Sequence, residues 1–216
     1  MILALAMLLT MFTLDAKRAE LADIQKVDPT IRVNLVFATG YKPIADIPVI
    51  MYPKDARAYI CKEAAYALAE VQQELNTYGY SLVIRDAYRP MWAQKRLWEE
   101  VLTLNLLNPE NYVSDPVVEG GRHPRGTAVD VTVVDIATNQ EISLPPFCFG
   151  EVAHRDYFGP LLSQEQIKNR DFLRSIMIKH GFSTIISEWW HFDYGNWREY
   201  EALDVSFEEL GKLFVP

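Results

Sequence analysis

The sequence at residues 120–134 reads GGRHPRGTAVDVTVV, in which a turn rich in glycine leads into a β-branched run. Valine and threonine favour pleated strands, so we expect a strand from Thr127 to Val134. Successive strand residues point to opposite faces, which places Asp130 on the face of the small residues Ala128 and Thr132. A carboxylate on an apolar strand is costly unless it is paired or bound to a metal. This stretch therefore predicts a sheet and a candidate polar site together, the alternative being an aspartate that bonds the adjacent turn.

Helical and strand patterns surround this strand without regular alternation. The expected elements are helices at Lys54–Tyr78, at Met91 to about Leu106 and from a Ser163–Gln166 capping box to His180, with strands at Ser81–Ile84 and Phe182–Ser187. Because these elements do not alternate as βαβ units, the order predicts an α+β fold. We expect a single domain with a mainly antiparallel central sheet flanked by helices.

The composition excludes several classes of protein. The chain has 216 residues, 21 Lys plus Arg and 29 Asp plus Glu, for a net charge of −8. This acidic balance, without a basic run, argues against nucleic acid or an anionic membrane as a partner. Two cysteines exclude a disulfide scaffold. Cys61 is expected as a small core residue on a helical stretch and Cys148 in a loop, and nothing in the sequence says that they pair.

The amino terminus carries an uncharged, mostly apolar run, residues 1–14. The run is shorter than the roughly 20 residues of a membrane-spanning helix, so we expect no transmembrane anchor. Residues 1–16 are either a signal peptide or an apolar segment docked on the domain formed by residues 17–216. The first alternative, which we favour, predicts a periplasmic or secreted protein, and the second a cytoplasmic one.

The four histidines differ in their surroundings. His180 lies in the last turn of a predicted helix, where its charge suits the helix dipole, and His154 lies in a polar loop. His123 and His191 each stand near carboxylates, the second in Glu188-Trp189-Trp190-His191. On a regular strand Glu188 and His191 would face opposite sides, so a shared role requires a bulge or an irregular turn. The alternative is an aromatic core segment with two polar residues at its rim.

Together, His123, Asp130 and His191 offer nitrogen, oxygen and nitrogen ligands, a set typical of a catalytic zinc site with one open position. Glu188 is then left as a general base for a metal-activated water. Arg89, held by the proline after it, is our candidate for stabilising the developing oxyanion.

These segments closely resemble the zinc D-alanyl-D-alanine dipeptidases, the VanX-like branch of metallopeptidases that include DD-carboxypeptidases and share the hedgehog fold. The family pattern Ser-x-His-x-x-Gly-x-Ala-x-Asp followed by Glu-x-x-His is matched here at every metal and base position. The resemblance implies one Zn²⁺ per chain and these roles: zinc ligands His123, Asp130 and His191, general base Glu188, stabiliser of the tetrahedral intermediate Arg89, and substrate-site residues Asp86 and Gly121.

Three positions depart from the family pattern. Gly121 replaces a serine that contacts the substrate, and Phe37 stands where tyrosine is frequent. Cys148 stands where an aspartate binds the substrate ammonium group, with Glu151 as a possible substitute. None of these positions belongs to the metal or base set, so they bear on which dipeptide is cleaved.

The sequence predicts hydrolysis of a small D-residue dipeptide, by default D-Ala-D-Ala. One alternative is a DD-carboxypeptidase or another peptidoglycan peptidase, and another is a zinc-binding module without catalysis. The last is disfavoured because Glu188 and Arg89, which only catalysis needs, are both present. The sequence gives no oligomeric state.

Overall fold

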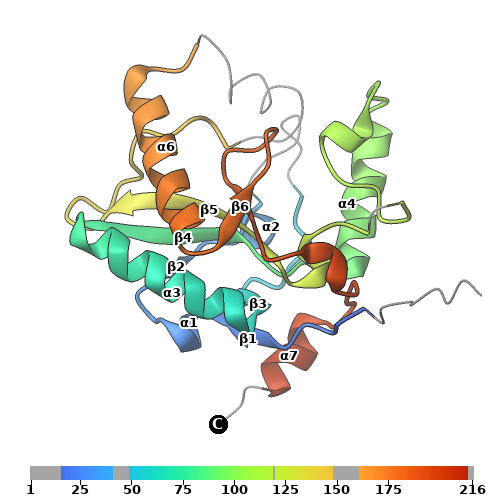
Figure 1. Cartoon of the computed structure of the whole chain (residues 1–216). Helices are drawn as coiled ribbons and strands as arrows, with labels where there is room; N and C mark the ends of the chain where they lie inside the picture. The colour runs from blue at the N-terminus through green and yellow to red at the C-terminus, as the bar shows by residue number, and fades with distance from the viewer. Residues whose placement is uncertain (1–15, 41–48, 119, 148–160, 214–216) are drawn as a thin grey trace, which may run out of the picture.

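The computed structural model describes residues 16–40, 49–118, 120–147 and 161–213. Within them, a five-stranded sheet has the strand order β2-β4-β5-β7-β6, and a two-stranded ribbon joins β1 to β3 (Figure 1). The strands are β1 (Leu21–Asp23), β2 (Arg32–Val33), β3 (Tyr59–Cys61), β4 (Tyr80–Asp86), β5 (Ala128–Asp135), β6 (Phe182–Thr184) and β7 (His191–Tyr194). Only β2 and β4 pair in parallel among these strands, so the predicted α+β fold with a mainly antiparallel sheet is confirmed.

Helices lie against the sheet and beyond its ends. They are α1 (Ile24–Val27), α2 (Val36–Thr39), α3 (Lys62–Thr77), α4 (Met91–Thr103), α6 (Gln164–Lys179) and α7 (Phe207–Leu213), with 3-10 turns η1 (Pro109–Asn111), η2 (His123–Arg125) and η3 (Trp197–Glu199). Helix α3 packs on β4, and α6 packs on β6 and on α3. Helix α4 stands away from this pair, beyond the end of β4 (Figure 1). None of the helices in the described residues is long and apolar enough to cross a membrane.

The helix predicted at Lys54–Tyr78 is shorter than expected and begins at Lys62. The reason is tertiary: Tyr59–Cys61 pair in register with Leu21–Asp23 and so form a strand. Cys61 therefore ends a strand, which corrects its predicted place on a helix, although it is buried in the core as expected. The rest of α3 buries one apolar face, and Gly79 beyond its end adopts a φ of +79°.

The other predicted elements are found with shifted ends. The Ser163–Gln166 capping box is formed as predicted. The predicted helix to Leu106 ends at Thr103, where Leu104 and Asn105 close it with hydrogen bonds to the last turn. The strand predicted to reach Ser187 ends at Thr184, because residues 185–190 leave the sheet before β7 begins.

Strand register gathers the site residues at one end of the sheet. Asp86 of β4 pairs with Asp130 of β5 across an irregularity that follows Ile84, and Asp130 pairs with His191 of β7. Three neighbouring strands thus place two aspartate side chains and one histidine side chain in one row across the sheet.

The chain just after residue 16 is tied to the domain. Lys17 donates its backbone N–H to the Glu199 carbonyl, and its own carbonyl accepts from the Glu201 N–H. Residues 1–15, which hold most of the predicted signal segment, lie outside the described residues.

Candidate metal and catalytic site

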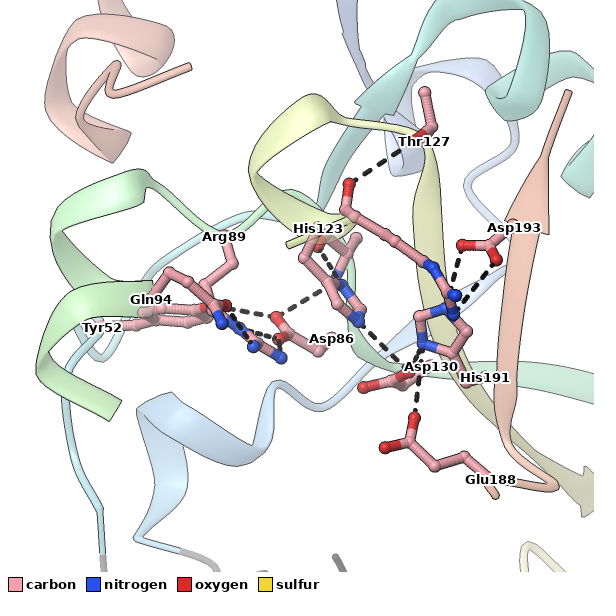
Figure 2. A network of polar contacts seen from close by, with 12 residues as sticks. Tyr52, Asp86, Arg89, Gln94, His123, Thr127, Asp130, Glu188, His191 and Asp193 are labelled. Atoms are coloured by element: carbon pink, nitrogen blue, oxygen red, sulfur yellow. Dashed lines mark hydrogen bonds and ion pairs between the residues drawn. The ribbon is translucent and has the colours of Figure 1, made fainter. Parts of the chain in front are cut away.

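The three predicted metal ligands converge. His123, Asp130 and His191 are all buried, and one ligand atom from each lies within 4.8 Å of the others. The Asp130 Oδ1 lies 3.4 Å from the His123 Nε2 and 3.1 Å from the His191 Nδ1. Figure 2 marks both contacts with dashed lines. The donor set expected from the sequence is therefore present in one place.

The remaining atoms of these residues fit a divalent cation. The second carboxylate oxygen of Asp130 is buried and has no hydrogen-bond partner within the described part of the chain, which suits a metal ligand. The His123 Nδ1 lies 2.7 Å from the Ala87 carbonyl, which leaves Nε2 for the metal. The His191 Nε2 lies 3.0 Å from an Asp193 oxygen, which leaves Nδ1. Two nitrogens and one carboxylate oxygen are ligands that zinc favours.

The local backbone explains how His123 arrives there. It begins the turn η2, in which Pro124 holds a compact conformation and Gly126 closes the turn at a φ of +67°. A Cβ at Gly126 would lie 2.5 Å from the Leu21 side chain, so the turn is pressed against β1 and needs glycine.

Within the triad of His123, Asp130 and His191, the pKa values of Asp130 and His191 are both shifted from their usual values. Burial alone would raise the pKa of Asp130, but His123 and His191 hold it well below its usual range. Burial lowers the pKa of His191, yet hydrogen bonds to Asp130 and Asp193 outweigh this and raise it to about 10. A metal cation would replace the proton between His191 and Asp130, because metal-ligating histidine must be neutral at the binding nitrogen.

Glu188 lies beside the triad in the irregular segment before β7. Its Oε2 is 3.6 Å from the His191 Nδ1, and its side chain is 17% exposed. Burial raises the pKa of this carboxyl, which suits a group that takes and returns a proton. The irregular turn required by the Glu-x-x-His spacing is therefore found.

Arg89 is held rigidly at the edge of the same site. Its Nε and Nη2 donate to one oxygen of Asp86 at 3.0 and 2.8 Å, and its Nη1 donates to Gln94 at 2.7 Å (Figure 2). Tyr52 donates to the other Asp86 oxygen, and the guanidinium lies 5.1 Å from the Phe37 ring centroid. Asp86 thus braces Arg89, while Phe37 provides an apolar surface for it.

A pocket opens onto these groups. Its walls include Arg89, Glu188 and both histidines, together with Gln94, Tyr112, Val113, Ser114, Gly121, Arg122 and Ile185. Gly121 has a φ of +71°, and a Cβ there would lie 3.1 Å from Pro124 and 3.3 Å from Gln94. The site therefore has little room for a serine at this position.

Some residues of the site were not predicted. Gln94 is buried on the apolar face of α4, where a lone glutamine among Ala93 and Leu97 was an available signal. Asp193 follows His191 by two residues and so shares its face of β7. Cys148, Glu151 and His154 lie outside the described residues. His180 contacts Glu70 and Glu74, away from the site, in agreement with its predicted place at the end of a helix.

A mainly antiparallel sheet brings a His-Asp-His set, a buried carboxylate and a braced arginine to one pocket, an arrangement that suits a metallopeptidase. The family model described as D-ala-D-ala dipeptidase matches residues 17–208, so the chain belongs to this family of metallopeptidases.

Curated relatives agree with this assignment. The chain is 34% identical over 189 residues to the D-alanyl-D-alanine dipeptidase of Escherichia coli (strain K12), covering 87% of this chain and 91% of that protein. It is 31% identical over 144 residues to the D-alanyl-D-alanine dipeptidase of Enterococcus faecalis (strain ATCC 700802 / V583), covering 61% and 70%. The solved vancomycin resistance D,D-dipeptidase VanXYg aligns with a TM-score of 0.42 and 17% identity over 89% of this chain and 74% of its own.

Proposed function

We propose that this chain hydrolyses D-Ala-D-Ala with one zinc ion held by His123, Asp130 and His191. The observation that carries the proposal is the position of Glu188. Its Oε2 lies 3.6 Å from the His191 Nδ1, and Glu188 is not part of the set formed by His123, Asp130 and His191. The relatives named as D-alanyl-D-alanine dipeptidases support the choice of substrate.

The chain's own groups divide the chemistry between them. His123, Asp130 and His191 would hold the zinc ion, which when bound would act as a Lewis acid toward the scissile carbonyl and lower the pKa of water. Glu188 takes a proton from the attacking water and returns it to the leaving amine as the C–N bond breaks. Arg89, held by Asp86 and Gln94, presents its positive charge to the oxyanion that forms on the carbonyl oxygen. The products are two D-alanine molecules, and the atoms of one water are consumed.

The decisive test is Glu188→Gln. We expect turnover of D-Ala-D-Ala to fall by about 10²–10⁴-fold, since a positioned general base contributes on that order. Zinc content, measured by elemental analysis, should stay at one ion per chain because Glu188 is not a ligand. Glu74→Gln is the matched control: Glu74 bonds Lys179 and His180 outside the site, and this variant should keep full activity. Near wild-type turnover by Glu188→Gln would refute the mechanism.

Substrate choice is tested with a panel of dipeptides. D,D-, L,D- and L,L-dipeptides and a peptidoglycan stem pentapeptide are assayed with and without a chelator. We expect cleavage of D-Ala-D-Ala that the chelator abolishes. Preference for the pentapeptide would instead assign a DD-carboxypeptidase, and a chain that holds no zinc and cleaves nothing would assign a binding module.

We also propose that residues 1–16 direct export, which the apolar run supports. Sequencing the amino terminus of the protein recovered from its native cells tests this. A start at Lys17 supports export, and an intact Met1 contradicts it.

A further inference from the structure

Asp193 is a buried carboxylate that the reaction described above does not use. It lies on β7, is 4% exposed, and its Oδ1 is 3.0 Å from the His191 Nε2. This nitrogen faces away from Asp130, so Asp193 and Asp130 hold the imidazole from its two sides (Figure 2). The ring can therefore turn little without losing one of these contacts.

A second group fixes Asp193 in turn. The Arg122 Nη1 lies 3.5 Å from the Asp193 Oδ2, and the guanidinium carbon lies 5.3 Å from the ring centroid of Trp197. Arg122 directly precedes the other histidine, His123. Arg122, which precedes His123, is thus paired with Asp193, the carboxylate that contacts His191.

The two histidines are supported differently. His123 is held by a neutral backbone carbonyl, that of Ala87, whereas His191 is held by a carboxylate. A carboxylate behind a metal-binding imidazole fixes its tautomer and makes the ring a stronger electron donor. Burial strengthens this interaction because little water screens it.

We propose that Asp193 is a positioning residue that holds His191 with its Nδ1 directed at the metal and raises zinc affinity, and that Arg122 keeps Asp193 in place. The inference rests on the proposed zinc site. It assigns Asp193 no contact with substrate and no part in proton transfer.

If Asp193 only stabilised the sheet, its backbone pairing and not its carboxylate would matter. Asp193 pairs with Ala128 and Ser183 through the backbone of the sheet, and these pairings do not need its carboxylate. In the described residues its side chain contacts His191 and Arg122. Asp193→Asn keeps the size and the backbone pairing, so it isolates the charge.

The test measures zinc affinity by competition with a chromogenic chelator. Asp193→Asn should lower affinity by about 10–100-fold, the usual effect of removing the partner behind a ligand. Excess zinc should restore most of its activity. Arg122→Met should lower zinc affinity by a smaller factor, because Asp193 remains.

Asp23→Asn is the matched control. Asp23 is also a buried carboxylate paired with an arginine, Arg57, but it lies on β1 and outside the metal triad. Thermal unfolding of the zinc-free proteins measures stability separately. Asp23→Asn should lower the unfolding temperature and leave zinc affinity at the wild-type value.

The outcomes separate the two proposals. If the wild-type chain binds zinc and Asp193→Asn binds it equally well, the positioning role is wrong while the proposed function stands. If Asp193→Asn loses affinity no more than Asp23→Asn, the effect is one of stability and the positioning role is again wrong. If the wild-type chain binds no zinc, the proposed function fails and this inference fails with it.

Discussion

The two ends of β5 carry the same side chain in opposite settings. Asp130, near its start, is fully buried between two histidines and has one oxygen without a partner among the described residues. Asp135, at its end, accepts hydrogen bonds from the backbone and hydroxyl of Thr138 at 2.8 and 2.9 Å. Both carboxyls have a lowered pKa, but hydrogen bonds within the following turn cause the shift at Asp135, whereas contacts with His123 and His191 cause it at Asp130.

This difference shows how to tell a structural aspartate from a candidate metal ligand. A structural aspartate has its oxygens satisfied within a few residues of the chain, as in the turn that follows Asp135. A candidate ligand contacts groups that are farther away in the sequence and keeps a buried acceptor without a hydrogen-bond partner among the described residues, as the second oxygen of Asp130 does. Such an acceptor costs folding free energy and is retained where a ligand will satisfy it.

The largest expected effect is at the first aspartate. Asp130→Asn removes the only carboxylate of the proposed ligand set, so we expect zinc affinity to fall at least about 100-fold and D-Ala-D-Ala turnover to be lost. Equilibrium dialysis against zinc gives the affinity. The matched variant Asp135→Asn should bind zinc as the wild type does, and equal zinc binding by both variants would abolish the contrast.

The next largest difference is expected in stability, between the glycine turns that lead into β5 and into β4. Gly126 and Gly79 both adopt positive φ, but a Cβ would collide with Leu21 only at Gly126, and none of the described side chains lies within 4 Å of a Cβ at Gly79. Gly79→Ala should therefore cost about 1–2 kcal/mol of unfolding free energy from backbone strain alone. Gly126→Ala should cost about 1–3 kcal/mol more than this, because its Cβ would also be overpacked against Leu21.

Chemical denaturation of the two alanine variants measures these costs. Gly126→Ala should also lower zinc affinity, because the turn η2 delivers His123. Equal destabilisation by the two variants would show that β1 does not press on the turn.

The smallest effect concerns pH. The pKa of Asp135 in the folded protein lies below its ordinary value of 3.8, so its stabilising bonds are present above that pH and are lost as the pH falls through the folded pKa. Asp135→Ala should therefore unfold at a slightly lower temperature than the wild type at pH 7. The two melting curves should approach each other as the pH falls through the folded pKa of Asp135. A difference that persists undiminished at low pH would contradict the assignment to the ionised carboxylate.

Local sequence was sufficient where a single segment determines its own structure. The β-branched run predicted β5, and the Ser163–Gln166 box predicted the start of α6 within a residue. The convergence of His123, Asp130 and His191 was also predictable, because the His-x₆-Asp and Glu-x-x-His patterns single out these residues.

Elsewhere the prediction was wrong because the structure depends on pairing between segments that are distant in the sequence. Residues 59–61 fit the apolar spacing of the following helix, and only their pairing with β1 makes them a strand. The partners of Asp193 and Gln94 could not be assigned for the same reason. Their roles exist only once β7 and α4 bring them beside His191 and Arg89.

The bridge between Lys17 and the segment at Tyr200 sets a practical limit for shortening the chain. Deleting residues 1–16 leaves both backbone hydrogen bonds of Lys17 intact. Deleting through Leu21 would remove these bonds and also the side chain against which Gly126 is seated. An expression fragment that begins at residue 17 should therefore keep a working site, whereas one that begins five residues later should lose it.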